Sequence, residues 1–157
     1  MKTAGISEIK QEMQHLSAKE IAVLCLRLAK FKKENKELLN YLLFKSHDLQ
    51  SYTENIKNVV EEEFKEVNKT NLYFAKKNLR RILRYLNKHI KYVADKQFEA
   101  SLLIHFCKLV KASGIQLKKS TALQNLYAQQ LKKIKAAISS LHEDLQYDML
   151  KEFEILE

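Results

Sequence analysis

The sequence predicts an all-α protein, built as a multi-helix bundle or a short stack of antiparallel helical hairpins, with about six to eight helices. We expect a single domain over residues 1–157. The chain has no proline and only two glycines among 157 residues, too few turn-formers for a β-sandwich, a barrel or a glycine-rich phosphate loop. Its 46% apolar and 30% charged residues exclude a disordered chain. Apolar residues recur at helical spacings of three and four.

Capping residues indicate where the helices begin. A short helix is expected over residues 7–15. Ser17 and Glu20 then form a capping box, which predicts a helix from residue 17, and the same pattern recurs at Ser51 and Ser140. The remaining signals are single N-caps at Thr70 or Asn71, at Asp95 and at Ser120, and a closing Gly114.

Two helix boundaries stay open because the apolar stripe runs through them. Residues 17–46 form either one long helix or two helices that meet near Lys33. Residues 120–156 likewise form one helix, or two that meet close to Ser139 and Ser140.

The positive charge is concentrated in the middle of the chain. Residues 1–68 contain eleven basic and eleven acidic residues, whereas residues 69–135 contain sixteen basic and two acidic ones. Residues 136–157, the acidic tail, contain one basic and six acidic residues. A net charge of +9 therefore predicts an anionic partner for the central third of the chain.

The helix expected over residues 72–93 separates its side chains by type. One face is apolar and must be buried: Leu72, Ala75, Leu79, Ile82, Leu83, Leu86, Ile90 and Val93. The opposite face is a line of cations, called here the basic ridge: Lys77, Arg81, Arg84, Lys88 and Lys91. Between them lies a strip of rings: Phe74, Tyr85 and Tyr92.

This combination predicts a non-catalytic binding module for an anionic partner. Lysine and arginine neutralise phosphates while rings stack on bases, so RNA or DNA is the first expected partner and an acidic protein the second. In the alternative interpretation the rings pack against a neighbouring helix, and the cations are solvated or meet Glu61–Glu63 and the acidic tail.

The C-terminal stretch supports a second hypothesis of a different class. One apolar stripe runs along both a basic segment, Lys132–Lys135, and an acidic segment, Glu143–Glu154. Laid antiparallel against a second copy, the basic half would face the acidic half. The protein would then be a scaffold or homo-oligomer associating through its C-terminal helix, with no role in nucleic-acid binding. Packing of this stripe within its own chain is the other explanation.

Catalytic spacings occur only as fragments. The run Glu62-Glu63-Phe64-Lys65-Glu66 resembles the Glu-Glu-x-x-Glu motif of the all-helical nucleotide pyrophosphatases, and this resemblance implies a magnesium-dependent hydrolase. The second acidic half of such a site is absent, since only Asp95 and Glu99 are acidic between residues 67 and 135. We therefore expect no enzyme, no cofactor, no metal site and no small-molecule substrate.

The two cysteines and the first residues indicate a compartment. Cys25 and Cys107 lie inside apolar helical runs, so buried free thiols are expected, although the sequence leaves a disulfide open. The polar start precedes no apolar leader, and no apolar run reaches the roughly eighteen residues of a membrane span. The sequence predicts a cytoplasmic protein with no membrane partner.

Overall fold

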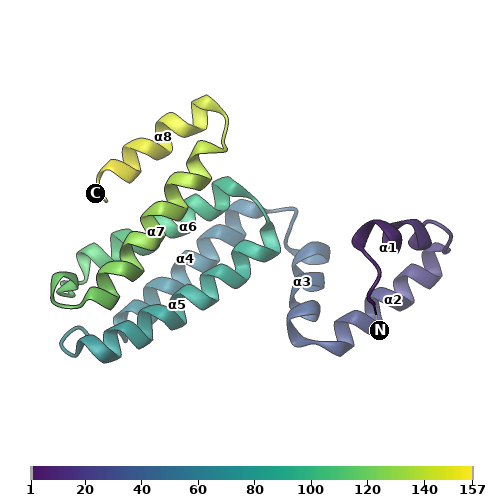
Figure 1. Cartoon of the computed structure of the whole chain (residues 1–157), viewed down its shortest axis with the longest axis horizontal. Helices are drawn as coiled ribbons and strands as arrows, with labels where there is room; N and C mark the ends of the chain where they lie inside the picture. Colours follow the sequence, from purple (N-terminus) through teal and green to yellow (C-terminus); the bar gives the residue numbers. More distant parts are fainter. Residues whose placement is uncertain (1, 157) are drawn as a thin grey trace. The chain divides into compact units, whose positions relative to one another are not determined.

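The computed structural model describes residues 2–156, which form eight α-helices, one 3₁₀ turn and no strand (Figure 1). The all-α prediction is confirmed. Contacts group the residues into two compact units, unit 1, Met1–Lys45, and unit 2, Ser46–Glu157. The single domain expected from the sequence stays a prediction. Unit 1 contains α1 (Ile6–Met13), α2 (Ala18–Phe31) and α3 (Lys33–Phe44). Unit 2 contains α4 (Leu49–Lys65), α5 (Leu72–Val93), α6 (Lys96–Ala112), η1 (Leu117–Lys119), α7 (Thr121–Ser139) and α8 (Glu143–Glu154).

In unit 1, α2 begins at the predicted capping box. The Glu20 amide donates to Ser17 Oγ at 3.3 Å, and the Ser17 amide donates to Glu20 Oε2 at 2.8 Å. Helices α2 and α3 are separate, because Lys32 between them adopts an extended backbone with φ −144° and ψ 137°. The Asn35 side-chain amide donates to the Leu28 carbonyl at 2.9 Å and so satisfies a carbonyl that the end of α2 leaves free.

In unit 2, α6 is the central helix and contacts α4, α5, α7 and α8 (Figure 1). Its apolar residues point in several directions around the helix, which is typical of a buried helix. The buried ones are Phe98, Ala100, Leu102, Leu103, Ile104, Phe106, Cys107 and Val110.

Helix α5 packs on this core with the face predicted from the sequence. It begins after Asn71, whose Oδ1 accepts hydrogen bonds from the next helical amides, and ends before Ala94, which has a left-handed φ of 54°. The buried residues of the predicted face are Ala75, Leu79, Ile82, Leu83 and Leu86, with Leu72, Ile90 and Val93 half-buried against the core. The amphipathic prediction for α5 is therefore confirmed.

Two predicted helix starts are wrong. Helix α4 is capped by Asp48, whose carboxylate accepts from the Ser51 amide at 3.0 Å, so the helix begins before Ser51. Ser140 ends α7 instead of starting α8, since its hydroxyl donates to the Ala137 carbonyl at 2.7 Å. The predicted N-caps at Asp95 and Ser120 are confirmed.

The C-terminal stretch consists of two helices. After α7, the chain reverses and α8 packs against α6 and α7 (Figure 1). Phe153 and Leu156 are buried in that contact. In the part of the chain that the structure describes, none of the helices has both the length and the apolar character that crossing a bilayer requires.

Candidate nucleic-acid interface

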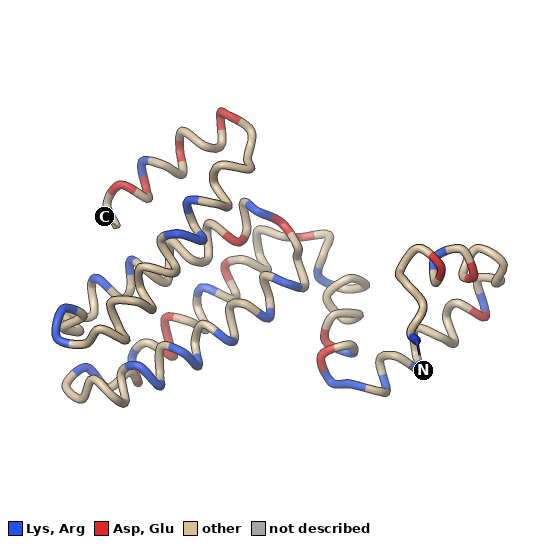
Figure 2. The backbone as a smooth tube through the Cα atoms, in the orientation of Figure 1, with Lys and Arg blue, Asp and Glu red and all other residues tan. Residues whose placement is uncertain are grey.

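The basic ridge lies on the outer side of α5, opposite the buried apolar face. Figure 2 shows Lys and Arg repeating along this helix. Lys77, Arg81, Arg84 and Lys91 are exposed and Lys88 is half-buried. At 1.5 Å per helical residue, the ridge extends for about 21 Å from its first to its last cation.

The ridge cation Arg81 is matched by a carboxylate. Arg81 donates to Glu63 of α4 at 2.6 Å, with more than 40% of each side chain exposed. The alternative interpretation, that the cations meet Glu61–Glu63, is therefore right for Arg81. Exposed pairs of this kind contribute about 0–1 kcal/mol, so the pair holds Arg81 only weakly.

The other carboxylates of this acidic run interact elsewhere. Glu62 pairs with Lys65 at 2.6 Å, and Glu61 Oε1 lies 3.2 Å from His105 Nε2. The acidic tail also has other partners, since Glu152 pairs with Lys108 of α6. Within residues 2–156, Lys77, Arg84 and Lys91 have no carboxylate at ion-pair distance. These three cations remain available to an anionic ligand.

The predicted ring strip is mostly used in packing. Tyr92 is only 9% exposed, and Tyr85 is half-buried with its ring 4.5 Å from that of His89. The Tyr52 hydroxyl lies 2.6 Å from His89 Nδ1 and joins α4 to this cluster. Burial, and to a smaller extent Glu63, raises the pKa of Tyr85. The expectation that Tyr85 and Tyr92 offer free faces to bases is corrected, because neighbouring rings and helices cover them.

An exposed ring pair at the start of α5 was not predicted. Phe74, which the sequence did indicate, is 48% exposed, and its ring centroid lies 5.4 Å from that of Tyr73, which is 64% exposed. Tyr73 precedes Lys77 by four residues and therefore lies on the ridge side of the helix. This four-residue spacing was the signal in the sequence that could have identified Tyr73.

Arg80 is a second residue that the sequence reasoning missed. It is exposed, follows Lys77 by three residues and precedes Arg84 by four, so it lies beside the ridge. No carboxylate of residues 2–156 lies at ion-pair distance from it. With Arg80, four exposed cations of α5 have no carboxylate at ion-pair distance among residues 2–156: Lys77, Arg80, Arg84 and Lys91.

The acidic motif that resembles the pyrophosphatase signature does not come together as a ligand set. Glu62 and Glu63 pair with cations, and Phe64, which follows them, is buried in the core. Among residues 2–156, no group of three or more His, Cys, Asp or Glu side chains is placed to hold a metal ion.

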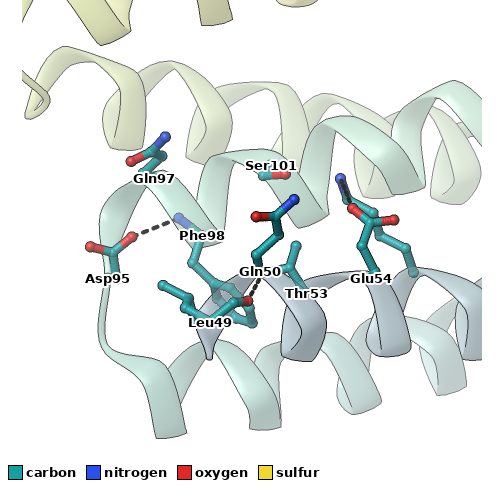
Figure 3. Close-up of a pocket in the computed structure, with 9 residues that line it drawn as sticks. Leu49, Gln50, Thr53, Glu54, Asp95, Gln97, Phe98 and Ser101 are labelled. Atoms are coloured by element: carbon teal, nitrogen blue, oxygen red, sulfur yellow. Dashed lines mark hydrogen bonds and ion pairs between the residues drawn. The ribbon is translucent and has the colours of Figure 1, made fainter. Parts of the chain in front are cut away.

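A polar pocket of about 300 Å³ lies where the first turns of α4 and α6 meet (Figure 3). Asp95 accepts from the Phe98 amide at 2.7 Å, and the Thr53 hydroxyl donates to the Leu49 carbonyl at the same distance. Glu54 lies 3.7 Å from Lys57. These polar groups cap helices or pair locally.

Two titratable side chains of α6, the buried Cys107 and the half-buried His105, have shifted pKa values. Burial raises the pKa of the Cys107 thiol to about 12, so it remains protonated. Burial also lowers the pKa of His105, and the nearby Glu61 opposes this shift only in part. Both cysteines are free, with Cys107 buried as expected and Cys25 only half-buried.

Comparison of the chain with protein-family models, with curated proteins and with solved structures finds no match.

Proposed function

We propose that unit 2 is a non-catalytic module that binds a nucleic-acid strand along α5. The proposal is carried by four exposed cations on one side of one helix without a carboxylate partner in residues 2–156: Lys77, Arg80, Arg84 and Lys91. The helix is held by its buried face, so the cations are positioned before the ligand arrives.

A single strand fits this surface better than a duplex. Tyr73 and Phe74 expose their rings at one end of the ridge, and unpaired bases can stack on such rings. The phosphates of the same strand would continue toward Lys91. Stacking is sequence-tolerant, so we expect affinity without strong sequence preference.

The test is binding of the full chain to labelled single-stranded oligonucleotides, followed by fluorescence anisotropy. With four phosphate contacts, log affinity should fall with log salt with a slope of about −2.8, a loss of roughly fiftyfold between 50 and 200 mM. Reversing three ridge charges, in the variant Lys77→Glu, Arg84→Glu, Lys91→Glu, should remove most of the binding. These side chains are exposed, so circular dichroism should show an unchanged helix content.

A matched control distinguishes the ridge from net charge. The variant Lys132→Glu, Lys133→Glu, Lys135→Glu makes the same change in charge on exposed positions of α7. It should retain most of the affinity of the parent protein. Equal losses in the two variants would mean that binding follows net charge, and no binding by the parent protein would remove the proposal.

Self-association through the C-terminal helix stays a prediction with less support. Most of the apolar stripe on which it depended is used within unit 2, where Ile134 and Ile138 are buried and Met149 packs against the core. Sedimentation at tens of micromolar tests it, and truncation after Ser139 should then dissolve any dimer.

A further inference from the structure

Unit 1 contains an apolar groove between α2 and α3. The groove has a volume of about 710 Å³ and is lined by Leu26, Ala29, Lys30, Lys33, Lys36, Leu39, Asn40, Leu43 and Phe44. Leu43 and Phe44 are 62% and 61% exposed, and Leu26 is 56% exposed.

The rest of unit 1 does not provide a core of its own. Of residues 2–45, Tyr41 is the only buried one. Phe31 and Ile6 are more than 80% exposed. An apolar surface of this extent marks a protein interaction site. A unit this small gains little stability from its own packing. A partner bound in the groove would therefore stabilise the folded form of unit 1.

The rim of the groove is cationic. Lys30 and Lys36 have no carboxylate at ion-pair distance among the described residues, and Lys33, 3.8 Å from Glu37, keeps 89% of its side chain exposed. Residues 1–45 contain nine basic and five acidic residues. A second copy of unit 1 would therefore bring the same positive charge to the groove, and like charges oppose that pairing.

The chemistry that complements the groove is an apolar stripe flanked by carboxylates. The acidic helix of this chain, α8, does not offer one freely, because Phe153 is buried and Met149 packs against the core of unit 2. Helix α3 has twelve residues and is about 18 Å long, which matches a partner helix of about three turns. Two helices that leave a groove between them commonly receive a third helix there.

We propose that the α2–α3 groove binds an acidic amphipathic helix of another protein. The partner's apolar residues, spaced i, i+3 or i+4 and i+7, would cover Leu26, Leu39 and Leu43. Its carboxylates would lie over Lys30 and Lys36. This inference is independent of nucleic-acid binding by unit 2, and either can fail without the other.

The test uses the full chain and two fluorescein-labelled peptides of roughly 21 residues with leucine at heptad positions a and d. One peptide carries glutamate at the remaining positions and the other carries lysine. The acidic peptide should bind saturably and the basic peptide should not. Leu43→Asp places a charge in the groove at an exposed position and should abolish binding of the acidic peptide.

The rim is tested by charge reversal. The double variant Lys30→Glu, Lys36→Glu should lower the affinity for the acidic peptide by at least about fivefold. It should also allow the basic peptide to bind. The matched control, Lys10→Glu with Lys19→Glu, changes the charge of unit 1 equally at exposed positions outside the groove lining and should leave both affinities nearly unchanged.

Three results would overturn the inference. Neither peptide binds the folded parent protein, or both bind it equally, or the rim and control variants lose the same affinity. Sedimentation provides a separate check. A dimer of the parent protein that Leu43→Asp dissolves would show that a second copy occupies the groove, against this inference.

Discussion

Neutralising Glu63 should strengthen nucleic-acid binding. In the free protein this carboxylate holds Arg81 at 2.6 Å, so the arginine must exchange one anion for another when a phosphate arrives. Glu63→Gln frees Arg81 and raises the number of available exposed cations on this side of α5 from four, Lys77, Arg80, Arg84 and Lys91, to five. The salt slope for a single strand should steepen by about 0.7, from about −2.8 to about −3.5.

The gain in affinity can be bounded from the same pair. An exposed ion pair contributes about 0–1 kcal/mol, so removing the competition strengthens binding by up to about fivefold. The extra contact also makes binding by Glu63→Gln more sensitive to salt. The affinity of Glu63→Gln divided by that of the parent protein should therefore be about 2.6 times larger at 50 mM than at 200 mM salt. Anisotropy titrations of the parent protein and Glu63→Gln at both salt concentrations measure these quantities.

Glu62→Gln is the matched control. It removes the same negative charge one residue away, but Glu62 pairs with Lys65, which is outside the ridge. A small and equal rise in affinity for both variants would show an effect of net charge alone. The reasoning is refuted if Glu63→Gln leaves the slope unchanged, or if Glu62→Gln steepens the slope as much.

Two further predictions concern the core of unit 2. Phe106 is fully buried, so Phe106→Ala should lower the free energy of unfolding by about 3–5 kcal/mol. Urea denaturation measures this change. A loss under about 1 kcal/mol would contradict the central position of Phe106. Because burial lowers the pKa of His105, the unfolded chain binds its proton more readily, and stability should fall as pH drops below about 6.5. His105→Gln should reduce this dependence in unfolding measurements between about pH 7 and pH 5, and an unchanged dependence would assign it to other groups.

The sequence contained enough information to predict helix content and the orientation of α5. Both follow from local rules: the scarcity of turn-formers excludes sheets, and an apolar stripe as regular as that from Ala75 to Leu86 can be buried in only one orientation. The N-caps at Ser17 and Asp95 were equally local, since a side-chain oxygen there meets amides three residues away.

Features that depend on contacts between helices were not predictable. The sequence around Tyr92 does not show that its ring is only 9% exposed, because burial of a residue between the apolar and basic faces depends on how the helices pack. The pairing of Arg81 with Glu63 joins residues 18 apart and required the register of α4 against α5. The errors at Ser51 and Ser140 arose because a capping pattern does not decide between two nearby candidates.

The turn between α5 and α6 has a consequence for how the ridge meets a ligand. Only Ala94 and Asp95 connect the two helices, and Ala94 adopts a left-handed conformation that costs an ordinary residue about 1–2 kcal/mol. The packing of both helices sustains that strain, so the end of α5 is anchored rather than hinged. A ligand would therefore meet a preorganised row of charges, and association would lose little backbone entropy on the protein side.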